Sequence, residues 1–153
     1  MRNSSVVVGG IVGTLFEPAT EPVAVLVVHP ATATPAGFYA GFAAFLAENR
    51  IAAVTYDYRG TGRSGSPRAH RAVGMKEWIE QDVPAVTGWA AERFPGLPQL
   101  AVGHSLGGHA LTLGYGGPGL TAFALLASHV ASIAWRRSRR FRTAPSAVGS
   151  GWC

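Results

Sequence analysis

The chain has 153 residues, of which 48% are hydrophobic and 14% charged, so it can bury the core of one ordinary globular domain, and its composition excludes a fully disordered chain. Its net charge of +5 equals the five arginines between residues 136 and 142, because the first 105 residues carry eight basic and eight acidic side chains. An arginine cluster with no aromatic stacking platform and no nucleic-acid motif is typical of a solvated tail. We therefore expect no nucleic-acid partner.

The cysteine count and the hydropathy pattern argue against a disulfide-rich, a secreted or a membrane-spanning protein. Cys153 is the single cysteine, so the sequence offers neither a disulfide framework nor paired cysteine ligands for a metal. Glycines interrupt the apolar stretch 6–15, and no A-x-A cleavage site follows it, which argues against a signal peptide. No apolar run reaches the roughly 20 residues that span a bilayer. These features predict a cytoplasmic protein without a membrane partner.

Predicted strands and helices alternate along the chain. A hairpin of strands is expected at 6–8 and 11–16, and later strands at 23–28, 51–56, 100–102 and 120–127. Helices are expected at 37–49, 82–94 and 105–113. This order predicts an α/β fold with three layers, a doubly wound, mostly parallel sheet covered by helices on both faces.

Two of the predicted helices carry specific signals. In the helix 37–49, Phe38, Gly41-Phe42 and Phe45-Leu46 recur at helical spacing, which predicts that they face the core. Asp82, followed closely by Pro84, marks the start of the helix 82–94, because proline is tolerated in the first turn, where its missing N–H costs nothing.

The most informative motif is Gly103-His104-Ser105-Leu106-Gly107-Gly108, which directly follows an apolar strand. It predicts a nucleophile elbow, in which a serine sits on a strained turn between a strand and a helix. Gly103 and Gly107 would remove the Cβ atoms that collide where the strand and the helix approach each other.

Two further motifs stand at the ends of predicted strands: His29-Pro30 after the third strand, and Tyr56-Asp57-Tyr58-Arg59-Gly60-Thr61-Gly62-Arg63-Ser64 after the fourth. With the serine motif after the fifth strand, the three occur in the order and spacing of the α/β-hydrolase superfamily. The chain resembles most closely its bacterial serine-aminopeptidase-like members, and the resemblance covers about residues 5–130.

The resemblance implies a serine hydrolase that cleaves a carboxylic ester, thioester or amide bond in a small acyl substrate, without a cofactor. It implies that Ser105 is the nucleophile. It also implies an oxyanion hole built from the backbone N–H of Leu106 and a second N–H in the loop after the third strand. Because Pro30 has no N–H, we expect Ala31 to supply that second donor.

The second half of the usual catalytic machinery is missing from the sequence. No Asp or Glu occurs between Leu106 and Cys153, although hydrolases of this type place the acid and the histidine after the serine. We therefore expect a partial hydrolase domain over residues 1–130, truncated after about the sixth strand. Residues 131–153 are expected to form an irregular, arginine-rich tail. Translation of a GC-rich gene in a shifted reading frame would produce such a tail. Activity is then weak or absent. The alternative is a non-catalytic binding or assembly module, with self-association through the exposed strand from Leu120 to Ala127.

Other polar residues were considered for the site. His29 is a candidate auxiliary residue that shapes the oxyanion loop, and His129 is another, because it follows the sixth strand at the same sheet edge. Asp57 is expected to anchor a turn by pairing with Arg59 or with backbone N–H groups. The glycines 60, 62 and 65 match a dinucleotide fingerprint, but no helix is expected at the last of them, so no NAD is predicted.

Overall fold

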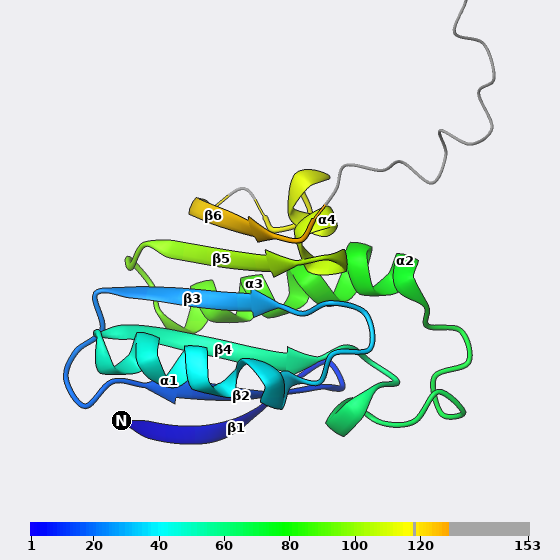
Figure 1. Ribbon diagram of the computed structural model, residues 1–153, viewed down its shortest axis with the longest axis horizontal. Helices are drawn as coiled ribbons and strands as arrows, with labels where there is room; N and C mark the ends of the chain where they lie inside the picture. The colour runs from blue at the N-terminus through cyan, green and yellow to red at the C-terminus, as the bar shows by residue number, and fades with distance from the viewer. Residues whose placement is uncertain (118, 129–153) are drawn as a thin grey trace, which may run out of the picture.

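Six strands form one mixed sheet in the order β1-β2-β4-β3-β5-β6 (Figure 1). The computed structural model describes residues 1–117 and 119–128, so His129 and the predicted tail 131–153 lie outside the described residues. The β1–β2 and β2–β4 pairs are antiparallel, whereas β3 pairs in parallel with β4 and β5, and β5 with β6. The mostly parallel sheet is therefore confirmed. Its strands are β1 (Arg2–Val8), β2 (Ile11–Glu17), β3 (Ala24–His29), β4 (Ile51–Asp57), β5 (Gln99–His104) and β6 (Leu120–Leu126).

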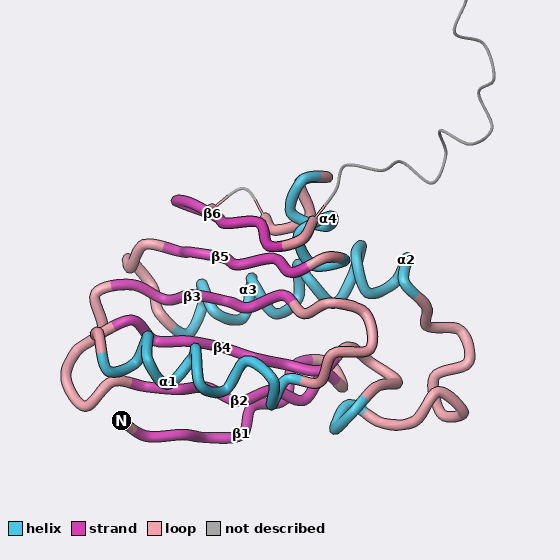
Figure 2. The backbone as a smooth tube through the Cα atoms, in the orientation of Figure 1, coloured by secondary structure: helices cyan, strands magenta, loops and turns pink. Residues whose placement is uncertain are grey.

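Helices cover the two faces of the sheet and complete the three predicted layers. A 3-10 turn, η1 (Ala36–Tyr39), leads into α1 (Ala40–Glu48), which lies in front of the sheet in Figures 1 and 2, while α3 (Val83–Arg93) lies behind it. The short helix α4 (Leu106–Thr112) packs with α3 against the rear core. Each face has its own cluster of buried side chains, because parallel strands bury apolar residues on both sides.

The predicted orientation of Phe38 in η1, and of Phe42 and Phe45 in α1, is wrong. Phe38, Phe42 and Phe45 are 71%, 42% and 58% exposed. The prediction for Leu46 is confirmed, because the helix turns Leu46 toward the sheet together with Ala43 and Ala47, and all three are buried. The phenylalanine stripe and the alanine-rich stripe have the same helical spacing, so spacing alone does not show which of them faces the sheet. Here the small alanines let the helix lie close to the strands.

The helix predicted to begin at Asp82 begins earlier. Helical backbone starts with α2 (Met75–Glu77) and continues through the π-helical turn η3 (Trp78–Asp82) into α3. In the wide turn, the Val83 N–H donates to the Trp78 carbonyl. Such a turn loosens the hydrogen-bond ladder, and Pro84, which has no N–H to donate, follows directly.

Asp82 therefore does not mark the start of the helix, and its side chain binds a loop instead. Its side chain is fully buried, and its carboxylate accepts hydrogen bonds from the Arg59 backbone N–H (2.9 Å) and from Arg59 Nε (2.6 Å). Trp78 adds a third link, because its indole Nε1 donates to the Arg59 carbonyl at 2.9 Å. These contacts fix the loop after β4 against the helical segment.

Candidate active site

Ser105 occupies the turn between β5 and α4. Its backbone angles, φ 51° and ψ −105°, lie outside the regions that serine ordinarily adopts. The close approach of strand and helix explains the neighbouring glycines: a Cβ on Gly103 would overlap Cα of Gly108, and a Cβ on Gly107 would overlap the carbonyl oxygen of His29. The turn therefore combines a strained serine backbone with two positions that accept no side chain.

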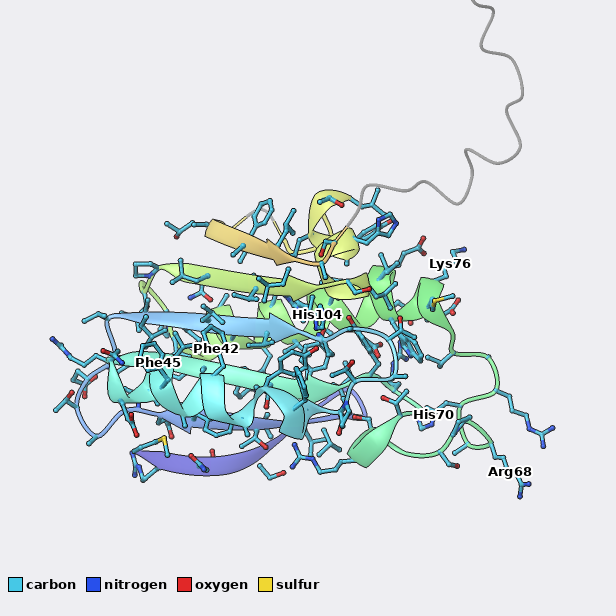
Figure 3. The ribbon with its side chains drawn as sticks, in the orientation of Figure 1. Phe42, Phe45, Arg68, His70, Lys76 and His104 are labelled. Atoms are coloured by element: carbon cyan, nitrogen blue, oxygen red, sulfur yellow. The ribbon has the colours of Figure 1, made fainter. Side chains whose placement is uncertain are left out.

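Ala31 lies in the loop after β3, and its backbone N–H already has a partner. It donates to the hydroxyl of Tyr39 at 3.0 Å, and the same hydroxyl lies 2.9 Å from Nδ1 of His104. Burial raises the pKa of Tyr39, so its hydroxyl stays protonated and can accept from Ala31 while donating to His104. Since His104, labelled in Figure 3, is the residue before Ser105, this network links the loop after β3 to the serine turn.

His29 is the last residue of β3, and its side chain has no exposed surface. Its Nδ1 is 2.8 Å from the Tyr56 hydroxyl, and its Nε2 is 3.4 Å from Oγ1 of Thr87 on α3. Burial lowers the pKa of His29 to about 3, so the ring is neutral near pH 7. The carbonyl of the same residue lies directly beneath Gly107. The structure thus places His29 as a support for the turn.

Asp57 ends β4 and holds two loops together. Its carboxylate accepts hydrogen bonds from the backbone N–H groups of Ala36 (2.7 Å) and Arg63 (3.0 Å). Of the two expected kinds of partner, Asp57 has the backbone N–H groups, whereas Arg59 binds Asp82. Both loops border a hollow of about 360 Å³ beside Ala31.

A second hollow, of about 260 Å³, lies on the α1 side of the same edge and is almost entirely apolar. Tyr39 and His104 line it, together with Phe38, Phe42 and Leu126. The network of Ala31, Tyr39 and His104 therefore borders both hollows. Tyr39 lies ten residues after His29, and no local sequence pattern indicates these contacts.

The comparisons with known proteins agree with this geometry. The family model described as "Serine aminopeptidase, S33" matches residues 20–140. The monoacylglycerol lipase of Mycolicibacterium smegmatis is 37% identical over 103 residues, which are 66% of this chain and 36% of the lipase. The chain thus spans about a third of the length of this relative.

Solved structures show the same fold. A thermostable carboxyl esterase from Bacillus coagulans matches with a TM-score of 0.64 at 18% identity, over 81% of this chain and 43% of the esterase. An α/β serine hydrolase homologue from Coxiella burnetii matches with a TM-score of 0.65 at 16% identity, over 89% of this chain and 67% of that protein. In the part of the chain that the structure describes, no helix is long and apolar enough to cross a membrane.

Proposed function

Because this chain belongs to the serine aminopeptidase S33 family of α/β hydrolases, we propose that it carries the nucleophile half of a serine hydrolase site, with Ser105 as the nucleophile. The observation that carries the proposal is the Ser105 turn itself. A serine with φ 51° between a strand and a helix, enclosed by glycines that no side chain could replace, is the arrangement of a nucleophile elbow.

The bond cleaved is proposed to be a carboxylic ester, and the chemistry extends to thioesters and amides. The name of the mycobacterial relative and the Bacillus coagulans esterase support an ester. Ser105 Oγ would attack the acyl carbon while a base takes its proton, and the alcohol would leave with a proton to give an acyl-enzyme. Water would then release the acid and restore the serine.

The developing oxyanion needs two backbone donors, for which we propose Leu106 and Ala31. Leu106 is the first residue of α4, where backbone N–H groups lack partners within the helix. The Ala31 N–H would have to turn from the Tyr39 hydroxyl to the oxyanion, or share its hydrogen between them. One such donor changes rates by about 10²–10³.

Within the described residues, neither His29 nor His104 is free to act as the base, and His129 lies outside them. His29 is neutral and buried, His104 binds Tyr39, and the sequence after Leu106 contains no carboxylate side chain. We therefore propose that these 153 residues alone hydrolyse esters slowly or not at all. Loss of triad members typically leaves about 10³–10⁴ of rate enhancement over water.

Chemical rescue tests this proposal. A fluorophosphonate probe is incubated with the protein at pH 7.5 with and without added imidazole, and the labelled residue is mapped by mass spectrometry. We expect slow labelling of Ser105 that imidazole accelerates, since imidazole would take the proton from Oγ. The Ser105→Ala variant should not be labelled there, whereas Ser128→Ala, which removes a nearby hydroxyl bonded to Gly103, should behave as wild type.

If neither condition labels Ser105 above the level of the Ser105→Ala variant, the proposed nucleophile is wrong. The non-catalytic binding or assembly module would then be the better description of the chain.

A further inference from the structure

The peptide unit between Pro30 and Ala31 is held at both ends by buried tyrosine hydroxyls. Its N–H, which belongs to Ala31, donates to the Tyr39 hydroxyl at 3.0 Å. Its carbonyl oxygen, which belongs to Pro30, accepts from the Tyr58 hydroxyl at 3.0 Å. Tyr58 is 3% exposed, and Pro30 is fully buried. Because these groups have almost no contact with solvent, water cannot readily replace either hydroxyl.

Two aromatic neighbours fix the ring of Tyr58, which directly follows β4. The ring stacks on Trp78, with centroids 5.1 Å apart and an interplanar angle of 11°, and Tyr56 meets it edge-on at 5.4 Å. Trp78 is itself fixed, because its indole Nε1 donates to the Arg59 carbonyl at 2.9 Å. Burial raises the pKa of Tyr58, so its hydroxyl stays protonated and donates to the Pro30 carbonyl.

Strand register places the Pro30–Ala31 peptide beside the serine turn. His29 on β3 pairs with Gly103 on β5, so Pro30-Ala31 leaves the sheet beside His104-Ser105. Tyr58 reaches the same edge, because β4 runs parallel to β3 on its other side (Figure 1). Ala31 and Tyr58 both line the hollow of about 360 Å³ at this edge.

The loop after β3 depends on these outside contacts for its shape. Ala33 has φ 60°, in the left-handed region that a residue with a Cβ rarely adopts. The Thr34 N–H donates to the Ala31 carbonyl at 3.2 Å, but that carbonyl belongs to the next peptide unit. The ring of Pro30 fixes its φ, which leaves ψ of Pro30 and φ of Ala31 as the rotations that turn the Pro30–Ala31 peptide. The two tyrosine hydroxyls restrain both rotations.

We propose that Tyr58 is a positioning residue for the oxyanion hole, an inference that rests on the proposed function of Ser105. A trans peptide is planar, and its carbonyl and N–H point in opposite directions, so a hydroxyl that fixes the carbonyl also fixes the N–H. Tyr39 occupies the N–H that the oxyanion needs, whereas Tyr58 holds the same peptide without competing for it. When the oxyanion shares the Ala31 hydrogen in a three-centre bond, the Tyr58 bond keeps the N–H in its direction.

The rate at which a fluorophosphonate labels Ser105 measures this positioning. Ser105 Oγ bonds to phosphorus, added imidazole takes the proton, and fluoride leaves. Negative charge develops on the phosphoryl oxygen, which therefore needs the oxyanion donors. Labelling of the 153-residue chain at several probe concentrations, with imidazole held constant, gives kinact, the rate constant of the covalent step, and KI, the probe concentration at half-maximal rate.

Tyr58→Phe removes the hydroxyl and keeps the ring. We expect kinact to fall at least about fivefold while KI changes less than about twofold, because a misdirected donor forfeits part of the 10²–10³ that one donor contributes. Leu46→Ala is the control for lost stability, since it removes buried apolar atoms from α1 and no hydrogen-bonding group. Its kinact should stay near the wild-type value. Circular dichroism verifies that both variants are folded.

A second variant tests whether Tyr58 acts through the Ala31 N–H. Ala31→Pro removes this N–H and should lower kinact by about 10²-fold or more. In the Ala31→Pro background, Tyr58→Phe should cause no further loss in kinact, because no N–H remains to be oriented. A merely structural role of Tyr58 would add its own loss to that of Ala31→Pro.

The outcomes separate this inference from the proposed function. If the wild type is not labelled at Ser105 above the level of Ser105→Ala, the proposed function is wrong and the positioning role of Tyr58 falls with it. If the wild type is labelled, the role of Tyr58 alone is overturned by any of three results: an unchanged kinact in Tyr58→Phe, an equal loss in Leu46→Ala, or additive losses with Ala31→Pro. If Ala31→Pro does not fold, the comparison of Tyr58→Phe with Leu46→Ala decides.

Discussion

Two neighbouring strands of the sheet differ in how closely the molecule surrounds them. At the end of β5, the Ser105 turn is packed so tightly that Gly103 and Gly107 have no room for a methyl group. In β6, one strand away, all the side chains after Leu120 are exposed. The difference shows that the proposed nucleophile depends on contacts with β3 and α4, whereas β6 contributes mainly an edge.

The largest loss of stability is expected from Gly107→Ala. The added Cβ would overlap a backbone oxygen of His29, which cannot move without displacing β3. We expect a loss of at least about 3 kcal/mol in the free energy of unfolding, measured by urea denaturation. Gly88→Ala is the control: its Cβ meets no atom, and in the exposed middle of α3 it should stabilise the protein by about 1 kcal/mol. Equal effects of the two variants would contradict the tight packing of the turn.

Acid is expected to loosen the same region through His29. The pKa of this ring is about 3 in the folded protein and 6.5 in the unfolded chain. The unfolded chain therefore binds the proton first, and stability is complete above pH 6.5 and falls as pH drops toward 3. At pH 4 the loss from this group is about 3 kcal/mol.

The matched variant for the acid prediction is His29→Gln, which does not titrate. Its free energy of unfolding should be lower than wild type at pH 7 and should change less between pH 7 and pH 4. If the two proteins lose stability in parallel, His29 is not the group responsible.

A smaller effect is expected from Tyr39→Phe. The change removes the hydroxyl that accepts from Ala31 and contacts His104, and leaves the ring in place. We expect a loss of about 1–2 kcal/mol in the free energy of unfolding, because the Ala31 N–H loses its partner. Hydrogen exchange at Ala31 should quicken, and unchanged exchange there would show that the hydroxyl does not hold this loop.

The smallest loss of stability is expected from a substitution in β6. Leu125→Ala, at 41% exposure, should cost less than about 1 kcal/mol when measured at a dilution that disfavours association. Leu46→Ala on α1 removes the same atoms from a side chain that is 6% exposed and should cost about 2–5 kcal/mol. Comparable losses would mean that β6 is packed as firmly as the core.

Sequence alone determined the alternation of strands and helices, the parallel core of the sheet and the strand–turn–helix at Ser105. These features depend on local signals: continuous apolar runs, glycines at the turn, and a serine motif directly after a strand. The strands from β2 to β6 were predicted to within two residues for the same reason, since their apolar runs end close to where the strands end. The first strand was predicted at 6–8 but begins at Arg2, because its first four residues are polar and carry no apolar pattern.

Only the tertiary structure decided which of these residues meet. The aromatic stripe of α1 and its alanine stripe have the same period, so the choice between them depends on how closely the helix can approach the sheet. Asp82 binds Arg59, and Tyr39 joins Ala31 to His104, across distances in the sequence that no local pattern records. Hydrogen bonds between distant loops form only after the sheet has brought those loops to one edge. The local motif therefore predicted the strand–turn–helix at Ser105 but not the network beside it.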